Sequence, residues 1–268
     1  MFINSIESLI DVLKHNKVSV FGTGMIASKF YTCLKLKGMT DSIDSFCVTQ
    51  KRQDFFCNKV IKNIEELEQH TIVFIAVHET SARQIENLLN ERYIYNIWIE
   101  PYLIELLWGK PIAENATIEM KNIIQNSNNY MISVRSLTID QYFNQNDFGY
   151  NLYIKANKLF STEETAFRRL EAFIGLIKSW EKNEFIGNNN IKVDANYQII
   201  DGTHRISVAD YFNAQHIKGN VYPVNQYYEE WAGMTLLKPE MFCADIFSDR
   251  ELYEIKQRFI QLKKKYSE

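Results

Sequence analysis

The chain of 268 residues lacks the features that would place it in several protein classes. None of its four cysteines (Cys33, Cys47, Cys57 and Cys243) forms a CxxC pair or has a histidine at metal-ligand spacing, so we expect reduced structural thiols. No stretch approaches about 18 uninterrupted apolar residues, so we expect no membrane span. Charged residues interrupt the early apolar runs, which argues against a signal segment. We therefore expect a cytoplasmic protein.

Strong net charge is also missing. The formal charge of −3 provides no general attraction for nucleic acid, and no nucleic-acid partner is expected. The composition, 46% hydrophobic and 24% charged, is that of an ordinary globular protein, and the length is sufficient for two domains. Lysines between 256 and 265 accompany a helical apolar pattern and indicate the solvated face of a terminal helix.

Residues 1–108 alternate between helix and strand patterns. Asn4 and Glu7 have the spacing of a capping box that opens a first helix. Further helical patterns cover 25–36, 64–69 and 81–92, and apolar strand patterns cover 18–21, 43–48, 72–77 and 94–99. Strands that alternate with helices predict an α/β domain with a parallel sheet covered on both faces.

The pattern changes after a connector over residues 109–130. This connector contains a helical stretch at 118–125 and an Asn-rich boundary at 126–129. Beyond it we expect a second domain over 131–224 and a helical extension over 225–268. The second domain has expected strands at 131–138, 150–154 and 217–222, a helix at 162–182, and a hairpin of 191–193 with 197–200.

The first domain contains a glycine loop between an expected strand and an expected helix. Val20 to Ala27 read GxGxxA from Gly22, so Gly22, Thr23, Gly24 and Met25 are candidate ligand-binding residues. The acidic residue that usually holds the ribose of a nicotinamide dinucleotide is missing after Val48, and Asp44 lies too early. NAD redox chemistry, another nucleotide-type ligand and a purely structural loop all remain open.

This segment resembles the amino-terminal Rossmann-like domains of surface-polysaccharide enzymes. The resemblance implies either a bound sugar nucleotide or a scaffold. His78 and Glu79 follow an expected strand and could face the same crevice, although a lone histidine there is more often a local hydrogen-bonding residue.

The second domain contains the sequence Ile199-Ile200-Asp201-Gly202-Thr203-His204-Arg205, in which a strand runs directly into a helix. Backbone amides at a helix N-terminus, together with an adjacent arginine, form a good binding site for phosphate. An ordinary Asp-Gly turn, with His204 and Arg205 in structural contacts, is the competing interpretation.

With its preceding helix and hairpin, this turn resembles the ParB/sulfiredoxin superfamily over roughly residues 131–224. The Asp-Gly-X-His-Arg form is most similar to ParB-related kinases that phosphorylate free serine or similar small hydroxyl compounds. The chain lacks the Gly-Glu-Arg-Arg form of partition proteins, and Thr203 replaces the catalytic cysteine of sulfiredoxins. The resemblance therefore implies a kinase that uses ATP or ADP with Mg²⁺.

Phosphoryl transfer depends mainly on positioning and charge neutralisation. Arg205 would hold phosphate oxygens, with the backbone at Gly202 and Thr203 close by, and His204 would donate a hydrogen bond or stabilise developing charge. Asp201 would hold Mg²⁺ or orient the acceptor hydroxyl.

In the kinases that the chain resembles, a glutamate at the start of the preceding helix acts as the base. Glu163 and Glu164 are the matching candidates. Ser161 and Glu164 also have capping-box spacing, which leaves Glu163 as the better candidate. Arg168 and Arg169 lie one turn further, and we take Arg168 as a candidate phosphate ligand.

The aromatic residues after position 222 are accompanied by acidic residues, so we expect them to pack in the core or form a homodimer contact rather than stack on bases. We expect a phosphotransferase acting on a small hydroxylated acceptor (a serine-like amino acid, a sugar or a sugar nucleotide) in bacterial surface-polysaccharide synthesis. The alternatives are a ParB-like module gated by CTP or ATP, and an enzyme that uses NAD or a sugar nucleotide at the Gly22 loop.

Overall fold

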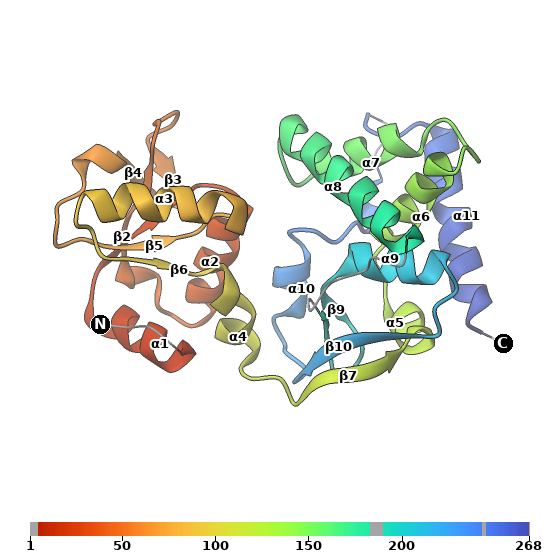
Figure 1. The fold of residues 1–268 in the computed structure, drawn as a ribbon, viewed down its shortest axis with the longest axis horizontal. Helices are drawn as coiled ribbons and strands as arrows, with labels where there is room; N and C mark the ends of the chain where they lie inside the picture. The colour runs from red at the N-terminus through yellow and green to blue at the C-terminus, as the bar shows by residue number, and fades with distance from the viewer. Residues whose placement is uncertain (1–4, 183–189, 243–244, 268) are drawn as a thin grey trace. The chain divides into compact units, whose positions relative to one another are not determined.

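A computed structural model describes residues 5–182, 190–242 and 245–267. Asn4 and Cys243 lie outside these ranges. The chain divides between Gly109 and Lys110 into two compact units (Figure 1). In the described part the fold is mixed α/β, with eleven α-helices and two sheets that each contain parallel strands.

The first unit has a six-stranded sheet in the order β3-β4-β2-β1-β5-β6. Its strands are β1 (Val18–Phe21), β2 (Ile43–Val48), β3 (Phe55–Phe56), β4 (Lys59–Asn63), β5 (Ile72–Ile75) and β6 (Asn96–Trp98). All neighbouring strands pair in parallel except the β3–β4 hairpin. The central strand β1 is buried along its whole length, as a parallel strand covered on both faces should be.

The helices of this unit are α1 (Ile6–His15), α2 (Met25–Leu36), α3 (Glu79–Glu91) and α4 (Leu103–Trp108), with 3₁₀ turns at Thr40–Ser42, Ile64–Glu66 and Glu100–Tyr102. The predicted bounds of β1, β2 and α2 are confirmed. Ser5 is the N-cap of α1: its hydroxyl accepts from the Ser8 amide, and Ser8 completes a capping box, while the predicted cap residue Asn4 lies outside the described residues.

The second unit has a four-stranded sheet in the order β7-β10-β8-β9. Its strands are β7 (Ala113–Glu119), β8 (Ile191–Asp194), β9 (Ile199–Asp201) and β10 (His216–Tyr222). Strand β10 pairs in parallel with β8 and antiparallel with β7. The predicted hairpin is confirmed as β8 and β9.

Seven α-helices accompany this sheet in the described residues. They are α5 (Met120–Asn126), α6 (Met131–Tyr142), α7 (Gly149–Lys158), α8 (Glu163–Glu181), α9 (Thr203–Tyr211), α10 (Tyr228–Ala232) and α11 (Asp249–Lys265), with a 3₁₀ turn at Pro239–Met241. From Lys110 on, the segment that we expected to be a connector is part of this unit, and its strand β7 pairs with β10. The extension is also part of it, since Phe247 and Ile255 lie in its core.

Four secondary-structure predictions were wrong. The expected helix at 64–69 is only the 3₁₀ turn Ile64–Glu66. The expected helix at 118–125 begins only at Met120, because Ile118 pairs with Ile217 in the sheet. The expected strands at 131–138 and 150–154 are the helices α6 and α7. Helix α6 is buried on all sides from Met131 to Asp140, so its sequence does not show the one-sided pattern of a surface helix.

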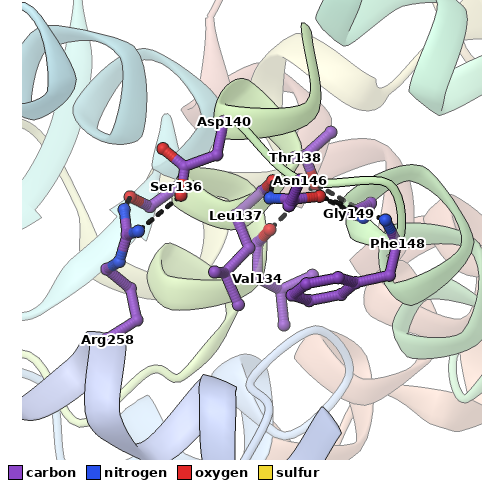
Figure 2. A network of polar contacts seen from close by, with 9 residues as sticks. All are labelled: Val134, Ser136, Leu137, Thr138, Asp140, Asn146, Phe148, Gly149 and Arg258. Atoms are coloured by element: carbon purple, nitrogen blue, oxygen red, sulfur yellow. Dashed lines mark hydrogen bonds and ion pairs between the residues drawn. The ribbon is translucent and has the colours of Figure 1, made fainter. Parts of the chain in front are cut away.

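Polar contacts fix the position of α6 among its neighbours (Figure 2). Arg258 on α11 donates to the Ser136 hydroxyl at 2.7 Å and forms an ion pair with Asp140. Before α7, the Asn146 side chain donates to the Leu137 carbonyl and accepts from the amide of Gly149. Helix α6 is thereby held from both sides at a fixed rotation.

Helix α8 begins differently from the prediction. Its N-cap is Thr162, whose hydroxyl accepts from the Thr165 amide at 3.3 Å, whereas the Ser161 hydroxyl donates to the Asn157 carbonyl. The expected capping box of Ser161 with Glu164 is therefore absent. Among the helices in the described ranges, none is both long and apolar enough to cross a membrane.

Candidate functional site

The turn between β9 and α9 forms one wall of the candidate site. Gly202 is the N-cap of α9 and has left-handed backbone angles (φ 99°, ψ 17°), and its amide donates to Asp201 Oδ1 at 2.8 Å. A Cβ on Gly202 would lie 2.7 Å from Cγ2 of Ile191. Both the left-handed backbone and the lack of space for a side chain therefore require glycine at this position. No side chain caps the helix, and its first-turn amides have no acceptor within the helix.

Arg205 lies in the first turn of α9, and its side chain is only 17% exposed. Its Nη1 is buried and has no hydrogen-bond partner, while Nη2 lies 3.9 Å from Asp201 Oδ2. Burial lowers the pKa of Arg205, and the charge of Asp201 opposes this shift. A buried guanidinium nitrogen without an acceptor is costly, and an anion would satisfy it.

A second buried arginine, Arg135, comes from the middle of α6. The residue is 8% exposed, and both Nε and Nη1 are buried without a partner. Burial lowers the pKa of Arg135 to about 10, the charge of Tyr153 opposes this shift, and that of Arg169 adds to it. Arg135 therefore lies near the other cations of the site.

His204 lies between aromatic and cationic side chains. Its Nε2 is 2.7 Å from the Tyr153 hydroxyl, and the Arg169 carbonyl oxygen lies 3.3 Å from the same hydroxyl, whose single proton can be donated to only one of the two. Burial lowers the pKa of His204 well below its usual value, and the charges of Arg135, Arg169 and Arg205 lower it further. The imidazole is therefore neutral near pH 7 and can act as a hydrogen-bonding group but not as a cation.

Arg169 belongs to the same cluster through its position on α8. Its Nη1 donates to Asn157 Oδ1 at 3.4 Å, and burial lowers its pKa while Tyr153 opposes that shift. The neighbouring Arg168, which we expected to bind phosphate, is exposed. One position along a helix is a rotation of about 100°, which explains why the two arginines face different surroundings.

The expected acidic residues lie at the surface. Glu163 and Glu164 are exposed at the start of α8, and Glu163 forms an ion pair with Lys158 at 3.1 Å. The Asp201 side chain is 56% exposed. The turn thus brings Asp201, Gly202 and Arg205 together as expected, whereas neither glutamate has a described contact with it.

Sequence reasoning missed Arg135 and Tyr153, because their segments were taken as strands. One signal was available: Arg135 is the only charged residue between Met131 and Ile139. A lone charge within an apolar stretch often marks a buried functional group.

The glycine loop of the first unit follows the carboxyl end of β1. β1 lies between β2 and β5, at the point where the strand order reverses and such sheets bind ligands. Gly22 has φ 110°, and a Cβ there would lie 2.9 Å from the Ala76 carbonyl oxygen. Gly24 is the N-cap of α2 and is exposed, as is His78, while Thr23 and Met25 are partly buried.

Comparison of the chain with protein-family models, curated proteins and solved structures finds no match.

Proposed function

We propose that the protein is a phosphotransferase that uses ATP or ADP to phosphorylate a small hydroxylated acceptor. The observation that carries the proposal is Arg205 Nη1, a buried donor without a partner, beside the uncapped N-terminus of α9. A phosphate group would satisfy both features, because it accepts hydrogen bonds from guanidinium and backbone N–H groups alike.

In this mechanism each residue of the turn has a separate role. Arg205 binds phosphate oxygens through its free nitrogen, and Gly202 lets the ligand approach the amides of Thr203 and the residues after it. His204, which is neutral, donates a hydrogen bond to phosphate from Nδ1 in the tautomer in which Nε2 accepts from the Tyr153 hydroxyl. Fixed donors of this kind stabilise charge as it moves between phosphate oxygens, without reorganisation during the reaction.

Asp201 is the residue that would hold Mg²⁺. The described residues contain no cluster of three or more histidine, cysteine or acidic side chains that could hold a metal. Mg²⁺ is commonly coordinated by one or two carboxylates together with substrate phosphates. The exposed Asp201, next to the proposed phosphate-binding site, fits that arrangement. The ion would neutralise phosphate charge.

Transfer to a hydroxyl also needs a base that takes the proton of the acceptor. Glu163 and Glu164 remain the candidates for the base. Glu163 would have to exchange its ion pair with Lys158 for the acceptor hydroxyl. Sugars, sugar nucleotides and serine-like amino acids all offer a suitable hydroxyl.

We further propose a Rossmann-like identity for the first unit and a ParB/sulfiredoxin-like identity for the second, with surface-polysaccharide synthesis as the setting. Support for these proposals comes from the central parallel strands around β1, the Asp-Gly-Thr-His-Arg turn and the sequence resemblances. The Gly22 loop of the first unit is, by the same resemblance, a proposed sugar-nucleotide site.

The test is transfer of the terminal phosphate from radiolabelled ATP or ADP, with Mg²⁺, to a panel of amino acids and sugars. Arg205→Lys should lose most of the transfer, and Arg168→Lys, at an exposed position of α8, should retain it. Binding of CTP or ATP without transfer would favour the gated module. Binding of NAD that is insensitive to Arg205→Lys would move the active centre to the Gly22 loop.

A further inference from the structure

Arg135 has no role in the mechanism above, although the tyrosine beside it contacts His204. Helix α6, which carries Arg135, packs against α7 and α9, the helices of Tyr153 and His204. Arg135 is buried, and its guanidinium hydrogen-bonds the Tyr153 hydroxyl, while Nε and Nη1 have no partner. Arg135 is therefore connected to the imidazole of His204 through one oxygen atom, that of Tyr153.

The Tyr153 hydroxyl has one proton and two acceptors close to it. His204 Nε2 lies 2.7 Å away, and the Arg169 carbonyl oxygen lies 3.3 Å away. A guanidinium has only donors, so the Tyr153 oxygen accepts from Arg135, with the Asn157 amide as a second, uncharged donor. An oxygen that accepts from a cation becomes a stronger donor of its own proton, because linked hydrogen bonds polarise one another.

The protons of Tyr153 and the neutral His204 can be arranged in two ways. In the first, Tyr153 donates to Nε2, and His204 carries its proton on Nδ1. In the second, Nε2–H donates to Tyr153, whose proton then goes to the more distant Arg169 carbonyl. The second arrangement requires the Tyr153 oxygen to accept from Nε2–H while it also accepts from Arg135. Arg135 therefore favours the first.

We propose that Arg135 is a positioning residue that sets the tautomer of His204 through the Tyr153 hydroxyl. It keeps Nε2 as the acceptor and leaves the proton on Nδ1. The consequence for catalysis rests on the proposed phosphotransferase function. An Nδ1–H group donates to a phosphate oxygen, whereas an unprotonated Nδ1 would present a lone pair to it. This role requires no contact between Arg135 and the ligand.

Nitrogen-15 NMR of the full-length protein, labelled at its five histidines, tests the tautomer directly, because protonated and unprotonated ring nitrogens differ in chemical shift. The signals that disappear in His204→Gln identify His204. Wild type should be protonated at Nδ1 and unprotonated at Nε2. Arg135→Met removes the charged donor and should lower the ratio of the Nδ1–H to the Nε2–H tautomer roughly tenfold or more. Arg168→Met, at an exposed position of α8, should keep the wild-type ratio.

The tautomer ratio separates positioning from a merely structural role, which would not change it. The signals of His216 on β10 check that the second unit is folded in each variant. Arg135→Gln, which keeps a donor without the charge, is the second variant if Arg135→Met does not fold, and it should change the ratio in the same direction by a smaller factor. Protonation of Nε2 in wild type, or an unchanged ratio in the folded variant, would overturn the proposal.

Phosphate transfer distinguishes this inference from the proposed function. Arg135→Met should slow transfer roughly tenfold or more, and adding it to His204→Ala should slow transfer no further, because Arg135 acts only through the imidazole. An Arg135-dependent tautomer without transfer by wild type would support the positioning role and refute the phosphotransferase. Transfer by wild type, with the same rate and the same tautomer in Arg135→Met, would support the phosphotransferase and refute the role of Arg135.

Discussion

Replacement of Gly202 by alanine should destabilise the second unit by about 1–5 kcal/mol. The left-handed backbone at φ 99° costs an alanine about 1–2 kcal/mol. The new Cβ would lie 2.7 Å from Cγ2 and 3.1 Å from Cα of Ile191, and such overpacking costs about 1–3 kcal/mol. The reduced entropy of the unfolded chain returns about 0.4–1 kcal/mol. The sum is a large fraction of the roughly 5–15 kcal/mol that stabilises a typical domain.

Hydrogen exchange followed by mass spectrometry is the appropriate assay, because peptides from residues 1–109 and 110–268 report on the two units separately. Gly175→Ala is the matched control. Gly175 lies within α8, where an added Cβ meets nothing within 4 Å, so alanine should stabilise the unit by about 0.5–1 kcal/mol. If the amides of the second unit exchange as slowly in Gly202→Ala as in wild type, the proposed backbone strain at Gly202 and its close contact with Ile191 are refuted.

Three further predictions concern individual side chains. Tyr153→Phe removes the hydroxyl that contacts His204, so it should cost about 1–3 kcal/mol in the same exchange assay and slow phosphate transfer; an unchanged transfer rate would contradict the role of this contact. Burial alone would raise the pKa of Glu251, but hydrogen bonds from Lys155 and the N-cap amide outweigh burial and lower it below 4.5. Because the pKa of Glu251 is lower in the folded protein, this stabilisation is present above pH 4.5 and is lost as the pH falls through the folded pKa. Glu251→Gln should therefore reduce the fall of the unfolding temperature at acidic pH. An unchanged fall would argue against the ion pair with Lys155. Burial raises the pKa of Cys47 to about 12, so iodoacetamide should modify this thiol only after unfolding, and rapid labelling of the native protein would refute its burial.

The sequence patterns that predicted elements correctly are those in which local signals and tertiary environment agree. Val18–Phe21 is a short apolar run and became a buried strand, and the glycine loop opens α2 at Met25 as predicted. The turn at Asp201–Arg205 was also predicted, since Asp-Gly and the following helical pattern are both local signals.

Helix α6 could not be predicted in the same way. Its residues from Met131 to Asp140 are all buried, so apolar and polar side chains alternate without a solvent-facing side, and β-branched residues then favour a strand. That error concealed Arg135. Arg168 and Arg169 could not be told apart from sequence because the rotation of α8 depends on its packing against α7 and α9.

Calorimetric titration of Mg-ATP and Mg-ADP into wild type and Arg205→Met tests whether the free donor Arg205 Nη1 binds phosphate. We expect saturable binding of at least one nucleotide to wild type and binding roughly tenfold weaker or more to Arg205→Met. Equal affinity for the two proteins, or no nucleotide binding to wild type, would contradict the proposed binding of phosphate by Arg205.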